Sequence, residues 1–101
     1  MDAVFVAVAD PTRRVLLERL RHGGAASIQA LGEGLPMTRQ AVTKHLDVLR
    51  EAGLVRVHRD GRERLHELEP LPLQAVDEWL RPYAEAWDDR LAALRRHLGE
   101  E

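Results

Sequence analysis

Residues 37–55 read MTRQAVTKHLDVLREAGLV, and residues 56–68 continue as RVHRDGRERLHEL. In the first stretch Val42, Leu46 and Leu49 fall on one face of a helix, because they lie three and four residues apart. The remaining side chains of that stretch are mostly polar and able to form hydrogen bonds. The first stretch therefore predicts an amphipathic helix with one apolar and one polar face.

The second stretch predicts two short strands joined by a tight turn. Apolar and charged residues alternate around Val57, which is typical of a half-buried strand. The dipeptide Asp60-Gly61 is among the strongest short signals of a β-hairpin. In the return strand we expect Leu65 or Leu68 to point inward.

Further helices are expected on both sides of this region. Asp10 and Pro11 suit the cap and the first position of a helix, Ser27 and Thr38 are caps for two more, and glycines follow the expected ends. The expected helices span about residues 2–9, 11–22, 27–32, 38–52 and 73–98, and the expected strand pair spans about residues 54–68.

The order of these elements decides the fold class. Helix, turn and helix followed by a basic hairpin is the arrangement of a winged helix-turn-helix, which places one helix in the major groove of DNA. A chain of 101 residues corresponds to one domain, so residues 1–101 are expected to form a single unit. We therefore predict a mainly α fold with a small β-hairpin.

The charge is divided unevenly along the chain. The formal net charge is −2, but residues 38–66 hold seven Lys or Arg against four Asp or Glu. Residues 67–101 hold four Lys or Arg against nine Asp or Glu. A basic region that coincides with the predicted helix and hairpin indicates a nucleic-acid surface, and an acidic remainder would stay away from the duplex.

The polar face of the helix at about 38–52 is the first candidate site. Arg and Gln side chains can bind guanine and adenine edges in pairs of hydrogen bonds, Thr can meet a thymine methyl group or a phosphate, and Lys neutralises a phosphate. The alternative is an ordinary surface helix with polar residues outward. The candidate DNA-binding residues are Thr38, Arg39, Gln40, Thr43, Lys44 and His45, the last of which would touch phosphate or brace the turn.

The tip of the hairpin is the second candidate site. Arg59, Arg62 and Arg64 surround Gly61, and three guanidinium groups at one tip form a probe for phosphates or the minor groove. The alternative is a charged edge strand that discourages aggregation. We expect contact with DNA.

Together these stretches resemble the ArsR family of small winged-helix repressors over nearly the whole chain. The matching segments are ADPTRRVLLERL at 9–20, TRQAVTKHLDVLREAGLV at 38–55 and RDGRERLHEL at 59–68. The ending at 71–98 is similar to a subgroup of the family without metal ligands. The resemblance implies a homodimer built by the first and last helices that binds a near-palindromic operator and blocks transcription. It also implies that Arg59, Gly61 and Arg62 form the wing and that the recognition helix is lined by Thr38, Arg39, Gln40, Thr43, Lys44 and His45.

Metal sensing has to be considered residue by residue, since founding members of that family sense metals. The chain has no cysteine, which excludes a thiolate site. His97 and Glu100 resemble half of the other common site, but the expected partners at Ala84 and Ala86 are alanines. Two ligands from the last helix of each subunit do not hold zinc tightly. We therefore expect no metal and no other cofactor, with His97 and Glu100 as weak candidates.

The last helix holds most of the aromatic residues. An apolar stripe along it predicts a dimer seam that packs with Phe5, and the alternative is a small-molecule pocket between subunits. Pro82 should kink this helix or divide it near Arg81. The candidate interface residues are Phe5, Trp79, Tyr83, Trp87, Leu91 and Leu94.

We therefore predict a cytoplasmic, homodimeric regulator that binds double-stranded DNA, without a membrane-spanning segment and with no effector identified. Two other functions stay open: a winged-helix module for protein–protein assembly, and a metal-responsive repressor. An enzyme is not expected, because no nucleophile, base or metal cluster stands out, and Asp88 and Asp89 are interpreted as solvated charges.

Overall fold

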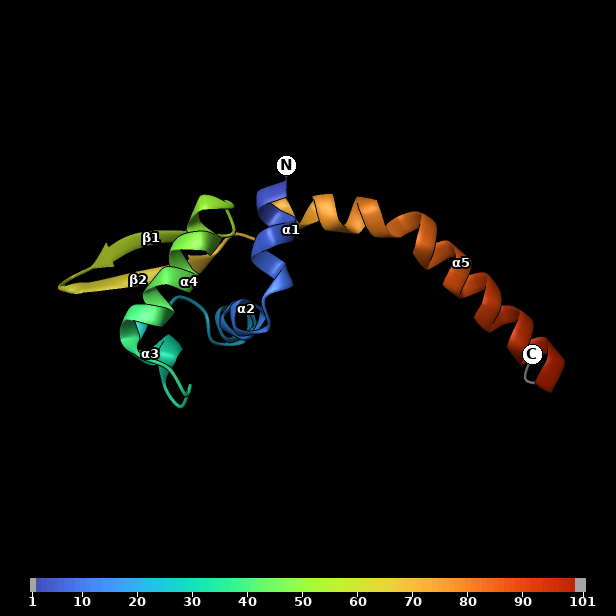
Figure 1. The fold of residues 1–101 in the computed structure, drawn as a ribbon, viewed down its shortest axis with the longest axis horizontal. Helices are drawn as coiled ribbons and strands as arrows, with labels where there is room; N and C mark the ends of the chain where they lie inside the picture. Colours follow the sequence, from blue (N-terminus) through green and yellow to red (C-terminus); the bar gives the residue numbers. More distant parts are fainter. Residues whose placement is uncertain (1, 100–101) are drawn as a thin grey trace.

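A computed structural model describes residues 2–99 and shows five helices and one strand pair in this part of the chain (Figure 1). The elements are α1 (Asp2–Ala9), α2 (Pro11–Gly23), α3 (Ile28–Gly32), α4 (Arg39–Glu51), β1 (Val55–Asp60), β2 (Glu63–Leu68), the short 3-10 helix η1 (Leu71–Leu73) and α5 (Gln74–Leu98). The predicted fold class, mainly α with a small β-hairpin, is confirmed.

Three helices begin at the side-chain caps that the sequence predicts. The carboxylate of Asp10 accepts hydrogen bonds from two backbone N–H groups of α2, at 2.8 and 3.2 Å. Ser27 and Thr38 each accept one from the N–H three residues later, at 3.2 and 3.1 Å. These bonds satisfy N–H groups that a helix start leaves without a partner.

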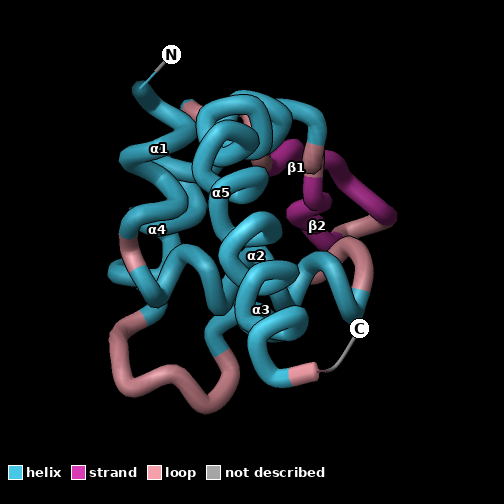
Figure 2. The backbone as a smooth tube through the Cα atoms, turned by 90° about the vertical axis from the view of Figure 1, so that its right-hand side faces the viewer, coloured by secondary structure: helices cyan, strands magenta, loops and turns pink. Residues whose placement is uncertain are grey.

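The core lies between α1, α2, α3, α4 and the start of β1. Helix α4 turns its predicted apolar face into this core, and its other side stays at the surface. In the view of Figure 2, helices α1 to α4 group together and the hairpin lies at one side of them. The buried apolar residues are Val4, Ala7, Leu16, Leu20, Leu31, Val42, Leu46, Leu49, Leu54 and Val55.

The turn of the hairpin lies one residue later than the Asp60-Gly61 signal suggests. Strand β1 pairs antiparallel with β2 up to the pair Asp60–Glu63, so the two loop residues are Gly61 and Arg62. Gly61 has a φ of +65°, whereas no other described residue of this turn has a positive φ. A glycine with positive φ at the first loop position is typical of a type II′ turn.

The inward face of β2 holds Leu68 and His66 rather than Leu65. Leu68 packs against the core, and the side chain of His66 is 3% exposed. The backbone of His66 exchanges two hydrogen bonds with Ala26, at 2.9 and 2.7 Å, which ties β2 to the segment between α2 and α3. His66 and Leu68 therefore share the face of β2 that turns toward the core.

Helix α5 continues through Pro82 as one helix of 25 residues and bends along its course (Figure 1). The bend agrees with the kink predicted at Pro82, and the helix is not divided there. Its C-terminal part projects away from the other elements, and the molecule measures 59 × 29 × 24 Å. Within residues 2–99 no helix is both long enough and apolar enough to cross a membrane.

Candidate nucleic-acid interface

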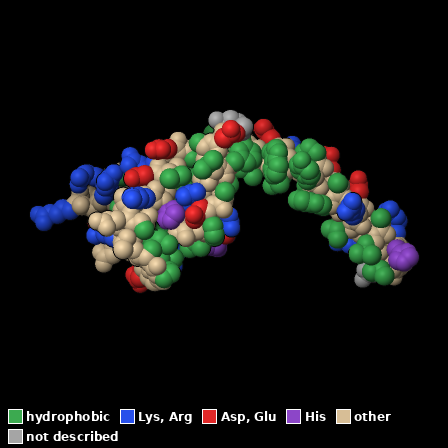
Figure 3. All heavy atoms as spheres, in the orientation of Figure 1, with side chains coloured by type: hydrophobic (Ala, Val, Ile, Leu, Met, Phe, Trp, Pro, Cys, Tyr) green, Lys and Arg blue, Asp and Glu red, His purple; other side chains and the backbone are tan. Residues whose placement is uncertain are grey.

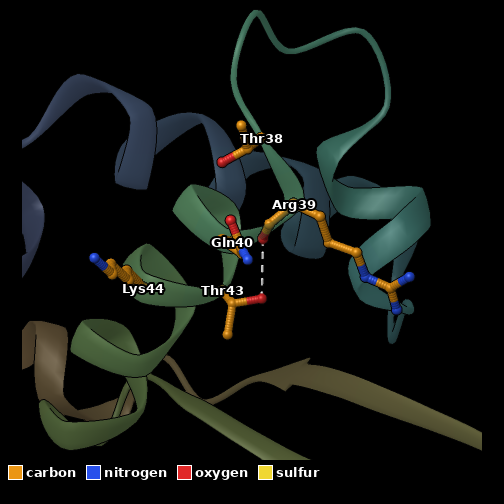
Figure 4. A pocket seen from close by; sticks show the side chains of 5 residues that line it. All are labelled: Thr38, Arg39, Gln40, Thr43 and Lys44. Carbon is orange, nitrogen blue, oxygen red and sulfur yellow. Dashed lines mark hydrogen bonds between the residues drawn. The ribbon is translucent and has the colours of Figure 1, made fainter.

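Five of the predicted recognition residues line one hollow on the outer side of α4. This surface hollow has a volume of about 620 Å³ and belongs to the first turn and a half of the helix (Figure 4). Arg39 and Lys44 extend from it in opposite directions, and Gln40 lies between them (Figure 4). The lining residues are Thr38, Arg39, Gln40, Thr43 and Lys44.

The hydroxyl group of Thr43 is already engaged within the helix. Its Oγ1 donates to the backbone oxygen of Arg39 at 3.0 Å, one helical turn earlier (Figure 4). Because that proton is engaged, the methyl group and the acceptor lone pairs of Oγ1 are the parts of Thr43 that remain for a contact outside the helix. Among the described residues, the cations of Arg39 and Lys44 have no carboxylate within 4 Å.

Further along α4, two charged residues share the outer face. Asp47 and Arg50 are both exposed. Arg50 was not among the predicted site residues. Arg50 follows Thr43 by seven residues, which is two helical turns, so this spacing was the available signal.

His45 lies on the inner flank of α4, toward α2. It is half-buried, and its Nδ1 lies 3.2 Å from Nη1 of Arg13. Of the two roles expected for His45, this contact favours bracing the helix over touching phosphate.

The basic residues of the hairpin divide into two groups, one at its base with acidic neighbours and one at its tip without them among the described residues. At the base, Arg56 lies 3.6 Å from Glu67 and 3.8 Å from Glu69, and His58 lies 3.6 Å from Glu67. At the tip, Arg59 and Arg64 stand directly opposite each other across the two strands, and Arg62 occupies the turn.

All three arginines of the tip, Arg59, Arg62 and Arg64, are exposed, and none has a carboxylate within 4 Å among residues 2–99. Like charges opposite each other destabilise a strand pair, so the tip favours an anion from outside the chain. Lys and Arg side chains gather at this end of the molecule (Figure 3).

The buried His66 lies close to both candidate surfaces. Burial lowers its pKa from the ordinary value of 6.5, and the positive charges of Arg64 and Arg50 lower the pKa further. The Nδ1 atom of His66 is buried without a hydrogen-bond partner in the described part of the chain. The imidazole is therefore held neutral near neutral pH, at the base of the hairpin.

The predicted interface residues of α5 form an exposed apolar stripe. Each large side chain of this stripe is half exposed or more, from 50% for Leu91 to 60% for Leu98, which extends the predicted set. These hydrophobic side chains follow the concave side of the bent helix, and acidic side chains lie on its other side (Figure 3). The stripe consists of Trp79, Tyr83, Trp87, Leu91, Leu94 and Leu98.

The weak metal candidates stand apart from other ligands. His97 is exposed near the end of α5, and Glu100 lies outside the described residues. Between residues 2 and 99, no three His, Asp or Glu side chains come together as a metal site.

Comparison with known proteins gives relatives along most of the chain. A family model described as a helix-turn-helix domain matches residues 8–58. The chain is 43% identical over 75 residues to the HTH-type transcriptional regulator Rv2034 of Mycobacterium tuberculosis (strain ATCC 25618 / H37Rv), which covers 74% of this chain and 69% of that protein. It is 30% identical over 91 residues to the transcriptional repressor SdpR of Bacillus subtilis (strain 168), which covers 90% of this chain and 100% of that protein.

A solved structure is similar in both fold and sequence. The crystal structure of the ArsR family transcriptional regulator RHA00566 superimposes with a TM-score of 0.73 at 37% identity, over 86% of this chain and 89% of that one. All three of these relatives are named as regulators of transcription, which is a class of DNA-binding proteins and not of enzymes.

Proposed function

We propose that this chain, which belongs to the ArsR family of winged helix-turn-helix transcriptional regulators and binds DNA, acts as a homodimeric repressor at a near-palindromic operator. The observation that carries the proposal is the combination of two surfaces. The polar outer face of α4 lies next to a hairpin whose three tip arginines, at positions 59, 62 and 64, lack acidic partners among residues 2–99.

The two surfaces have different tasks in this proposal. Arg39 and Gln40 read base edges in the major groove, and the methyl group of Thr43 meets a thymine methyl group. Lys44 and the tip arginines bind phosphates, which sets the position of the protein on the duplex without reading its sequence. Gly61 gives the wing its turn, and His45 acts from the inner side of α4.

The homodimer is supported by the apolar stripe of α5 together with Phe5. Monomeric soluble proteins rarely expose a contiguous apolar patch larger than a few hundred Å². Six large apolar side chains in succession along one projecting helix favour a second copy as the cover, since an isologous contact buries the same stripe on both chains. Two recognition helices would then enter successive major grooves roughly 34 Å apart.

The proposal is tested by selecting bound duplexes from a random DNA library, with added zinc and with a chelator. We expect enrichment of a near-palindromic sequence whose half-sites are about one helical turn apart, with the same sequence in both conditions. A matched selection with the Arg39→Ala and Gln40→Ala double variant should enrich a less defined sequence.

Two results would contradict the proposal. Binding without enrichment of any sequence would favour a module that meets acidic partners by charge alone. Enrichment that depends on zinc would favour the metal-responsive repressor instead.

A further inference from the structure

Arg13 joins three elements through one guanidinium group. Its Nε donates to the backbone oxygen of Ala7 at 2.7 Å, and Nη2 donates to that of Val6 at 2.9 Å. Its Nη1 lies 3.2 Å from Nδ1 of His45 in α4. The side chain is 13% exposed, and the carboxylate of Asp10 lies 3.9 Å from Nη1. Arg13 therefore connects the end of α1 and the start of α2 with the helix proposed to read DNA.

Arg14, the next residue, also caps the end of α1 but makes no hydrogen bond with α4 in the described part of the chain. Its Nη1 donates to the backbone oxygens of Val8 and Ala9, at 2.8 and 3.0 Å. Arg13 and Arg14 thus satisfy the last four carbonyl groups of α1, which have no partner inside the helix. Arg14 forms no hydrogen bond with α4 in the described part of the chain, so the two arginines differ in the contact with His45.

The contact with Arg13 involves one ring nitrogen of His45, Nδ1. A guanidinium group donates hydrogen bonds and accepts none, so Nδ1 of His45 is the acceptor. Because His45 lies within the recognition helix but faces inward, Arg13 holds the flank of α4 opposite its polar outer face.

We infer that Arg13 is a positioning residue for sequence recognition, which acts by setting the orientation of α4 through His45. This inference rests on the proposed function. Bidentate contacts to base edges require accurate placement of the helix, whereas contacts of long flexible cations to phosphates tolerate small displacements. Loss of the Arg13–His45 contact should therefore reduce the preference for the correct sequence more than it reduces binding to DNA in general.

The matched pair Arg13→Ala and Arg14→Ala separates this role from capping. The probes are a duplex that the wild-type protein selects from a random library and a scrambled duplex of equal length and composition. Both variants should lower the midpoint of thermal unfolding, because each leaves two carbonyl groups of α1 unsatisfied. The quantity compared is the ratio of the affinity for the selected duplex to the affinity for the scrambled duplex. Arg13→Ala should lose about tenfold in affinity for the selected duplex, with the affinity for the scrambled duplex nearly unchanged. Arg14→Ala should keep the wild-type ratio.

Variants of His45 give a second readout that does not depend on the capping of α1. His45→Gln retains a side-chain oxygen that can accept from Arg13, and His45→Leu retains similar bulk without an acceptor. We expect His45→Gln to keep most of the wild-type ratio and His45→Leu to lose about as much as Arg13→Ala. The double variant of Arg13→Ala and His45→Leu should have a ratio of affinities no lower than that of either single variant, because both substitutions remove the same contact.

The outcomes separate this inference from the proposed function. If the wild-type protein selects no sequence, the proposed function fails and the inference fails with it. If the wild-type protein is selective but Arg13→Ala and Arg14→Ala change the ratio equally, the inference is overturned and the proposed function stands. Should Arg13→Ala not fold, a wild-type ratio for His45→Leu overturns the inference by itself.

Discussion

The ring of Phe5 meets the ring of Trp79 edge to face, with the centroids 5.9 Å apart and the planes at 82°. Trp79 in turn packs against Tyr83, at a centroid distance of 5.3 Å. This contact fixes the first turns of α5 against α1, and edge-to-face pairs of this kind are favourable beyond the area they bury. Past Tyr83 the apolar stripe of α5 continues with no cover among the described residues.

Trp87→Glu should convert the proposed dimer into a monomer. Trp87 is 55% exposed in the single chain, and a carboxylate in its place would have to be desolvated in the dimer. Sedimentation at micromolar concentration should report about half the wild-type mass. Asp89→Ala is the matched control, because Asp89 follows two residues later and faces another side of the helix. A wild-type protein that is itself a monomer would contradict the seam on α5.

Gln40→Ala or Arg39→Ala should relax the sequence preference of DNA binding. Both side chains line the hollow on the outer face of α4, and loss of a bidentate base contact costs roughly 1–3 kcal/mol at the position it reads. Competition between the selected duplex and single-base variants of it should show one position whose preference disappears. Unchanged preference at all positions would exclude these residues from base reading.

Arg62→Ala should weaken the binding of all duplexes about equally and reduce the dependence on salt. Arg62 lies in the turn of the hairpin without an acidic partner among the described residues, so it is free to displace counterions from phosphate. Each lost phosphate contact lowers the slope of log affinity against log salt by about one. Arg56→Ala, at the paired base of the hairpin, is the control and should leave the slope unchanged.

Gly61→Ala should damage the wing without a steric clash. A Cβ atom at this position meets nothing within 4 Å, but the φ of +65° is a conformation that alanine adopts at a cost of about 1–3 kcal/mol. Gly24→Ala, at a φ of +78° and equally open, is a matched control at the end of α2. Both variants should lose similar stability, and a loss of duplex affinity should follow from Gly61→Ala alone.

The stability of the fold should decline as the pH falls below about 6.5, because of His66. Burial lowers the pKa of His66 in the folded chain, so the unfolded chain binds the extra proton more readily. The contribution is complete above the unfolded value of 6.5 and is lost with decreasing pH, by at most about 1.4 kcal/mol per pH unit for one proton.

Urea unfolding between about pH 6.5 and 5 measures this effect, since most carboxyl groups titrate lower. His66→Leu should flatten the decline. An exposed histidine of the same hairpin provides the control, and His58→Gln should retain the decline. If the stability of both variants declined equally with falling pH, the decline would be due to other groups.

The starts of the helices could be predicted because their signals are local. Asp10, Ser27 and Thr38 cap helices through N–H groups two or three residues away, and the spacing of Val42, Leu46 and Leu49 decides which face of α4 is buried. The polar face that lines the hollow follows from the same spacing. These features need no knowledge of distant parts of the chain.

Other features depend on which segments meet in space. Ala26 pairs with the backbone of His66, Arg59 faces Arg64 because the turn begins one residue later than the Asp60-Gly61 signal suggests, and Arg13 reaches His45 from α2. Alternation along a strand says that two faces differ but not which of them a third segment will cover. A contact between residues that are 32 positions apart is settled by packing, which local propensity does not encode.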